Sequence, residues 1–398
     1  MSNERVVVIG GSVAGASVVN ALARGGRECE VTLVSADPQF PPYDPPPLSK
    51  EILSGAWPLE RARFRTTLPP GARVRTGTRA VGLDPDRREV FTDDGAVLGY
   101  DRLVLATGSR PRELRTGAPL PPRGVHRLRT VADALALRDA LRPGGSLLVV
   151  GAGLIGCEVA ATAVGSGMDV TVVDPAPLPL LRMGGEPLGA FMAARHREHG
   201  VRLFLGSQVR EIIGEDRVTG AVLDNGTHIP CDAVLMGIGA VPETEWLAGS
   251  GLPVDDGVVC DATCTVAGVP EVMAVGDVAR WHSGRFGGLL RVEHWTNAVE
   301  QAAHAGRNLF EEPERRTAFD SVPYAWSVQY GLRVQVLGLA DTPAAVVQED
   351  RASGRLLCLY GGSDGLRGVV AVGRPEIVAR ARRAIADRTP VDALSWAA

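Results

Sequence analysis

The sequence predicts an α/β protein built on two doubly wound parallel sheets. Two glycine-rich turns each close an apolar, strand-like run and open a helix of small residues, in residues 6–15 and 147–156. Each helix is followed by a second apolar run that ends near an acid, Asp37 in the first case and Asp174 in the second. This strand–turn–helix–strand pattern is typical of a Rossmann-like unit that binds a dinucleotide.

The two turns also indicate what such units would hold. Glycine permits the tight turn, and its missing side chain lets backbone amides and the helix N-terminus approach a pyrophosphate. The acid after the second strand is placed to accept hydrogen bonds from a ribose. The first turn has Ser12 where the second has Gly153, which adds one hydroxyl. Two units in one chain predict two dinucleotides, with electrons passing from one to the other.

The features that follow the turns predict two domains of similar fold. An acid, an apolar strand, a glycine turn and a proline recur in residues 100–112 and 231–242. A third junction carries Asp277 at the carboxyl end of a strand, where ligands bind in open parallel sheets. We expect Asp277 to lie at the N-terminus of a helix. We expect a first domain from residues 1–112 and 241–318, a second domain inserted at 113–240, and a small α/β domain at 319–398.

Composition narrows the class of protein. The 398 residues are 45% hydrophobic, enough for two or three domains with their own cores. The formal net charge of −4 gives no support for nucleic-acid binding. We expect no signal peptide and no association with a membrane, because no apolar run reaches the ~20 residues needed to cross a bilayer. A cytoplasmic protein is the expectation.

The six cysteines do not favour thiol or metal chemistry. None belongs to a C-x-x-C pair. Cys260 and Cys264 are four residues apart but lack two further ligands at a spacing that suits zinc. No cysteine lies between Cys29 and Cys157, where flavoprotein disulfide reductases of this general architecture keep their redox thiols. We therefore expect neither a metal site nor a redox-active disulfide.

One basic residue differs from all the others. Of 42 basic residues, only Lys50 is a lysine, and it ends a proline-rich segment, residues 41–50. Arginine replaces lysine readily on a solvated surface, but not where a compact ammonium is needed. The pattern predicts a functional role for Lys50, with chance as the alternative explanation.

Taken together, the motifs resemble those of the NADH-dependent ferredoxin reductases, which serve bacterial ring-hydroxylating dioxygenases and haem monooxygenases. The resemblance covers essentially the whole chain in the same order, and the proline-rich run ending at Lys50 is its most specific part. Monodehydroascorbate reductases and the apoptosis-inducing-factor group share the fold and some of the motifs. The matching segments are the two glycine turns, Glu158, and residues 42–50, 106–108, 276–277, 293–298 and 323–327.

Three positions depart from the family pattern. Pro45 stands where the family usually has arginine, Ser12 where it has glycine, and Val328 where it has an acid. The change at Pro45 removes a possible polar contact to the flavin. The change at Val328 puts in doubt any contact that the acid makes near the flavin or the partner protein.

The resemblance implies a glutathione-reductase-like fold in which an NAD domain is inserted into an FAD domain. Lys50 would lie beside flavin N5 and pair with Glu158, and Trp295 would lie near the isoalloxazine on the path by which electrons leave. These three would be the catalytic residues, without a metal. The residues implied to bind FAD are Gly10, Ser12, Ala14, Gly15, Asp37, Lys50, Ala80, Arg129, Asp277 and Trp295. Those implied to bind NAD are Gly151, Gly153, Ile155, Gly156, Asp174, Arg182 and Gly239.

The expected reaction follows from the resemblance. Hydride would move directly from NADH to FAD, and electrons would then pass singly to a [2Fe–2S] ferredoxin that feeds a monooxygenase or dioxygenase. Asp174 favours NADH because it would repel a 2′-phosphate. Two alternatives stay open: an NADH-dependent reductase of a small organic radical or quinone, and an NAD(H)-responsive flavoprotein sensor. A substrate pocket beside the flavin would favour the first, and slow turnover with every acceptor the second.

Overall fold

The chain forms two compact units in the computed structural model, which describes residues 4–114 and 119–397. The first unit consists of the described parts of Met1–Asp44, Arg63–Arg110 and Val241–Ser321. The second consists of the described parts of Pro45–Ala62, Pro111–Ala240 and Val322–Ala398. None of the described helices is long and apolar enough to span a bilayer.

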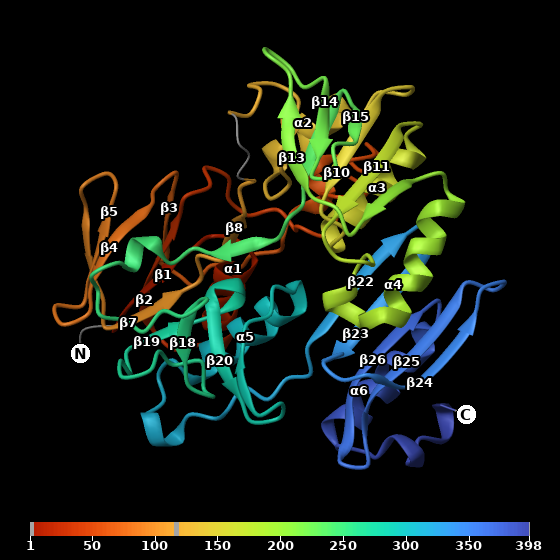
Figure 1. Cartoon of the computed structure of the whole chain (residues 1–398). Helices are drawn as coiled ribbons and strands as arrows, with labels where there is room; N and C mark the ends of the chain where they lie inside the picture. The colour runs from red at the N-terminus through yellow and green to blue at the C-terminus, as the bar shows by residue number, and fades with distance from the viewer. Residues whose placement is uncertain (1–3, 115–118, 398) are drawn as a thin grey trace. The chain divides into compact units, whose positions relative to one another are not determined.

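A five-stranded parallel sheet forms the centre of the first unit (Figure 1). Alternate residues along one of its strands belong to the hydrophobic cores on its two faces: Val6 and Val8 face one side, and Val7 and Ile9 face the other. Apolar residues on both sides are what a parallel sheet covered on both faces requires. In spatial order the strands are β19 (Val272–Ala274), β7 (Arg102–Leu105), β1 (Glu4–Ile9), β2 (Cys29–Ser35) and β3 (Arg73–Thr76).

Helices cover one face of this sheet and smaller sheets cover the other. Helices α1 (Val13–Gly25) and α5 (Trp295–Asn308) pack on each other and bury Val18, Leu22 and Ala302 against the first face. Trp281 is buried at the second face. The strands on that side are β4 (Ala80–Asp84), β5 (Glu89–Thr92), β6 (Val97–Gly99), β18 (Val258–Cys260), β20 (Ala279–Ser283) and β21 (Gly288–Leu290).

The second unit repeats this plan around another five-stranded parallel sheet (Figure 1). In spatial order its strands are β12 (Arg202–Leu205), β11 (Asp169–Asp174), β10 (Ser146–Val150), β16 (Ala233–Met236) and β9 (Val125–His126). The helices that contribute to the core on one face are α2 (Val131–Ala140), α3 (Leu154–Gly165) and α4 (Leu181–Glu198). The opposite face packs on β13 (Val209–Ile213), β14 (Gly220–Leu223) and β15 (His228–Pro230).

The C-terminal segment of the second unit is an antiparallel sheet with one helix, α6 (Val378–Ala386). Its buried residues join the core that α3 and α4 form, and the Tyr360 hydroxyl donates to the Gly184 carbonyl of α4 at 2.6 Å. In spatial order the strands are β22 (Tyr324–Gln329), β23 (Leu332–Gly338), β26 (Gly365–Val372), β25 (Arg355–Gly362) and β24 (Ala344–Asp350). Two short strands, β8 (Ser109–Pro111) and β17 (Ala240–Pro242), lie where the chain passes from one unit to the other.

The predicted fold class is confirmed. Both parallel sheets have the strand order of a dinucleotide-binding domain, and the C-terminal segment adds a small α/β sheet. The C-terminal segment belongs to the same compact unit as the second glycine turn. The division into FAD and NAD domains at residues 112, 240 and 318 stays a prediction.

Both glycine turns are shaped by one steric constraint. A Cβ on Gly10 would lie 2.1 Å from the Ala106 carbonyl oxygen, and one on Gly151 would lie 2.3 Å from the Gly237 carbonyl oxygen. Each turn is thus pressed against the strand-to-turn junction of the neighbouring strand. Both glycines also have positive φ, +113° and +106°, where an L side chain is strained. Glycine is therefore required here by the fold itself.

We predict that Gly10→Ala destabilises the chain far more than Gly26→Ala. Gly26 also has positive φ, +67°, but a Cβ there would meet nothing within 4 Å. Gly26→Ala should therefore lower the free energy of unfolding only by the ~1 kcal/mol of left-handed strain. Gly10→Ala adds a backbone clash and should lower it by about 3 kcal/mol or more. Chemical denaturation of the two variants measures the difference. Equal midpoints would show that the close approach is not rigid.

Candidate functional site

The two glycine turns open helices whose first-turn amides have no side-chain cap. Ser12 precedes α1 with φ −81° and ψ −161°, and Gly153 precedes α3 with φ −76° and ψ −173°. Neither helix has a side-chain cap hydrogen bond at this residue. Uncapped amides beside a glycine turn are the donor set that a pyrophosphate takes. Both turns fit a dinucleotide, and Ser12 keeps the backbone that Gly153 has.

The two acids that follow the turns differ in their surroundings. Asp174 ends β11, and its carboxylate accepts from the Ala152 amide at 2.6 Å and from the Ala176 amide at 2.7 Å. The second glycine turn and its acid are therefore held together. Asp37 lies after β2 in an exposed loop and accepts from the Gln39 amide at 2.8 Å. In the part of the chain that the structure describes, its carboxylate makes no hydrogen bond to the first glycine turn.

A buried ion pair lies in the second unit. Lys50 Nζ is 2.9 Å from Glu158 Oε2, and the two side chains are 14% and 3% exposed. Ser49 donates to the same carboxylate oxygen, and Ser327 donates to Glu158 Oε1 at 2.7 Å. Thr162 of α3 in turn donates to the Ser49 carbonyl at 2.8 Å. Burying a charge is tolerated only where donors replace the lost water, and Glu158 has three of them.

Sequence reasoning missed Ser49 and two residues of β22 in this cluster. Ser327 and Gln329 lie on β22 and are buried, while Val328 between them is 39% exposed. Two polar residues on the buried face of an otherwise apolar sheet are the signal that could have revealed them. The departure at Val328 therefore changes the surface and leaves the buried cluster intact.

Trp295 and Asp277 lie in the first unit, each tied to a polar neighbour. Trp295 begins α5, and its indole Nε1 donates to Asp44 at 2.5 Å. Burial raises the pKa of Asp44, and this hydrogen bond opposes the rise. Asp277 lies in a single 3₁₀ turn, Gly276–Val278, rather than at the start of a longer helix as its pattern suggested, and it accepts from Ser109 at 2.8 Å. The residue before Trp295, His294, has its pKa lowered to about 4 by burial.

The remaining predicted residues lie in their expected segments. Ala14 and Gly15 are in the first turn of α1, and Ile155 and Gly156 are in that of α3. The other four are Ala80 at the start of β4, Arg129 just before α2, Arg182 in the first turn of α4, and Gly239 just before β17.

Comparison with known proteins assigns the family. The pyridine nucleotide-disulphide oxidoreductase model matches residues 4–302, and the reductase C-terminal model matches residues 324–397. The chain is 36% identical to putidaredoxin reductase of Pseudomonas putida over 98% of its length and 94% of that protein's. It is 35% identical to the biphenyl dioxygenase system ferredoxin–NAD(+) reductase component of Paraburkholderia xenovorans, covering 98% and 95%.

A solved structure agrees. The reductase in the covalent putidaredoxin reductase–putidaredoxin complex matches with a TM-score of 0.90 and 34% identity, over 98% of this chain and 95% of that one. The chain belongs to the NADH-dependent ferredoxin reductase family. As a member it is an oxidoreductase that uses FAD and NAD(H), and the resemblance inferred from the sequence is confirmed.

This ferredoxin reductase keeps all six of its thiols buried and unpaired. Burial raises the pKa of Cys231, Cys260 and Cys358 to about 12, so these thiols stay protonated at neutral pH. Thiolates, which would be the nucleophiles of disulfide chemistry, are therefore disfavoured. Among the described residues, no three His, Cys, Asp or Glu side chains are grouped to hold a metal ion.

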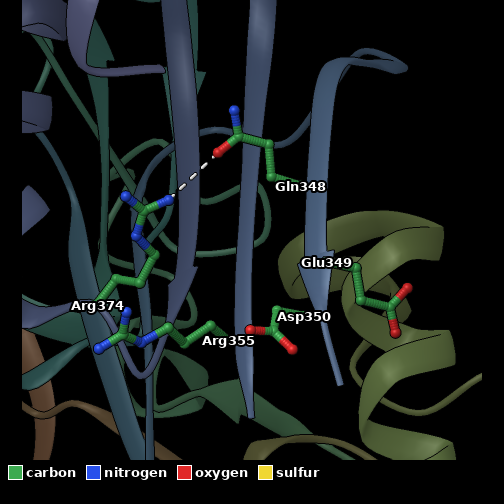
Figure 2. Close-up of a pocket in the computed structure, with 5 residues that line it drawn as sticks. All are labelled: Gln348, Glu349, Asp350, Arg355 and Arg374. Atoms are coloured by element: carbon green, nitrogen blue, oxygen red, sulfur yellow. Dashed lines mark hydrogen bonds between the residues drawn. The ribbon is translucent and has the colours of Figure 1, made fainter. Parts of the chain in front are cut away.

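A hollow lined by polar side chains lies at the C-terminal sheet of the reductase (Figure 2). None of the predicted site residues lines it. Arg374 reaches across it and donates to Gln348 Oε1 at 3.3 Å. Its lining mixes acids and arginines, with Glu349, Asp350 and Arg355 completing it.

We predict that the ion pair of the reductase shows strong coupling in a double-mutant cycle. Lys50→Met leaves the Glu158 carboxylate buried without its cation, and Glu158→Gln leaves the ammonium without its anion. Each should cost about 3 kcal/mol. The double variant should cost clearly less than the sum, because no buried charge is left. Chemical denaturation of the four proteins gives the coupling energy, and additive losses would contradict a true pair.

Proposed function

We propose that this reductase takes hydride from NADH onto FAD and delivers electrons one at a time to a [2Fe–2S] ferredoxin of an oxygenase system in the cytoplasm. Bound FAD supplies the chemistry that converts a two-electron donor into one-electron steps. The observation that carries the proposal is the pair of matching glycine turns, one in each unit, each opening an uncapped helix.

The first glycine turn is proposed to hold FAD. Uncapped amides at the start of α1 would bind the pyrophosphate, and Gly10 and Gly15 leave room for it because neither has a side chain. Asp37 would accept from the adenosine ribose and Asp277 from the ribitol, with Ser109 keeping the Asp277 carboxylate in place. Ser12, Ala14, Ala80 and Arg129 complete the proposed FAD set.

Lys50, Glu158 and Trp295 are proposed to act at the flavin ring. Lys50 would hold a proton at Nζ and offer it as a hydrogen bond at N5, where hydride arrives. Glu158 keeps that ammonium in one position, since it accepts from Lys50 and from two serines. Trp295, fixed by its hydrogen bond to Asp44, would lie on the route to the ferredoxin.

The second glycine turn is proposed to hold NADH. Gly151, Gly153 and Gly156 would admit the pyrophosphate to the start of α3, with Ile155 exposed in that first turn. Asp174 would accept from both hydroxyls of the adenosine ribose and would repel a 2′-phosphate. Arg182 and Gly239 complete the proposed NAD set, and the proposed NAD domain remains residues 113–240.

Acceptor specificity tests the function. We predict that the FAD-loaded protein reduces a two-iron ferredoxin with NADH far faster, in kcat/KM, than it reduces quinones of similar potential. Stopped-flow spectroscopy of the ferredoxin and of the flavin follows both steps. A preference for quinones would support the reductase of small molecules, and rapid flavin reduction followed by slow reoxidation with every acceptor would support the sensor.

Cofactor preference tests Asp174. We predict that Asp174→Asn combined with Pro175→Arg raises the NADPH-to-NADH ratio of kcat/KM at least about tenfold, equivalent to ~1.4 kcal/mol. Asparagine removes the charge and keeps one acceptor oxygen, for either the Ala152 or the Ala176 amide, which donate to different oxygens of Asp174. The control is Asp169→Asn, at the opposite end of β11. A wild-type preference for NADPH would contradict the role given to Asp174.

A further inference from the structure

Buried polar side chains on β22 continue from the Lys50–Glu158 pair into the C-terminal sheet. Ser327 donates to Glu158, and Gln329 Nε2 donates to Ser327 Oγ at 3.0 Å. On α4, His196 Nδ1 lies 2.6 Å from the hydroxyl of Tyr330, the residue that follows β22. Ser327, Gln329 and His196 are at most 1% exposed. Such side chains need partners, since unpaired buried polar atoms are costly.

The relay to Glu158 ends at Gln329. Gln329 Oε1 and His196 Nε2 are both buried, and neither atom has a hydrogen-bond partner among the described residues. Burial lowers the pKa of His196 to about 4, and the Gln329 side chain opposes this shift. No hydrogen bond closes between the two side chains, so the relay consists of Gln329 and Ser327, with His196 and Tyr330 beside its far end.

Donor and acceptor chemistry gives the links one direction. The amide nitrogen of Gln329 can only donate, so it donates to the Ser327 oxygen. That oxygen already accepts a hydrogen bond, so the hydroxyl proton is directed at Glu158. Every link donates toward the carboxylate, an arrangement in which hydrogen bonds polarise one another.

The opposite direction would require another protonation state. If the Ser327 hydroxyl pointed to Gln329, its oxygen would face a Glu158 oxygen 2.7 Å away. Two oxygens at that separation need a proton between them, which only a protonated Glu158 could supply. The direction of the links is therefore coupled to the charge of Glu158.

We propose that this one-directional relay of hydrogen bonds from β22 holds the Glu158 carboxylate in position and so keeps Lys50 in place as its ammonium partner. Ser327 and Gln329 act here as positioning residues. The consequence for catalysis rests on the function proposed above, whereas the effect on the ion pair does not.

The other ionisable groups around the relay stay neutral or lie at its far end. Burial raises the pKa of Cys157, next to Glu158 in α3, well above its usual range. Burial likewise raises the pKa of Tyr330. His199, stacked on Tyr330 with ring centroids 3.9 Å apart, lowers the pKa of His196 by charge repulsion. At the near end, Lys50 is the one cation bonded to the carboxylate among the described residues.

The single lysine of the chain makes the test direct. Full-length protein grown with ¹³Cε,¹⁵Nζ-lysine gives one side-chain signal, that of Lys50. We predict that in Ser327→Ala, at one fixed neutral pH, the Lys50 signal shifts toward that of a solvated lysine, because Glu158 loses one of the hydrogen bonds that hold its carboxylate against the ammonium. Ser327→Thr, which keeps the hydroxyl, should restore the wild-type signal, and Val328→Ala is the matched control on the exposed face of β22.

A second variant tests the rest of the relay. Gln329→Met should shift the Lys50 signal in the same direction by less than Ser327→Ala, because Gln329 acts through one more link. An unchanged signal in Ser327→Ala overturns the proposal. If that variant fails to fold, by circular dichroism, an unchanged signal in Gln329→Met decides the same question. The measurement uses neither NADH nor ferredoxin, so failure of the proposed reaction would leave its result standing.

Discussion

The burial of one carboxylate constrains much of the second unit. Glu158, on α3, is 3% exposed and is bonded by residues from two other stretches of sequence, the proline-rich segment and β22. Its desolvation is offset only while all the donors remain in place. The proline-rich segment, the helix after the second glycine turn and the C-terminal sheet must therefore keep their mutual positions. A cofactor site that depends on Lys50 inherits this rigidity.

The two glycine turns impose a second constraint, which is repeated in both units. In each, a glycine presses on the carbonyl of the neighbouring strand's junction, and a second glycine five residues later presses on the first. The helix N-terminus is thus fixed relative to the carboxyl edge of its sheet. The fold presents two similar anion-binding ends, and what distinguishes them is the side chains around them, such as Asp174 against Asp37.

The sequence predicted the features that depend on local spacing. Both glycine turns, their strands and the strand at residues 272–274 follow from periodicity and turn chemistry, and the structure contains them. The Lys50–Glu158 contact was reached through the family resemblance, since no spacing links residues 108 apart. Ser49, Ser327 and Gln329 were missed because strand and loop patterns do not say which distant charge a polar residue meets. Asp277 was predicted at the start of a helix because a glycine–acid pair is as compatible with a helix start as with a 3₁₀ turn.

The six buried thiols have a practical consequence. They are spread over four separate cores: Cys29 lies under α1, Cys260 and Cys264 lie under the small sheets of the first unit, Cys231 lies beside β13–β15, and Cys157 and Cys358 lie with α3 and the C-terminal sheet. An alkylating reagent can reach each one only when its own core opens. Alkylation rates mapped by mass spectrometry would therefore report local opening in every core of the native chain, without any engineered label.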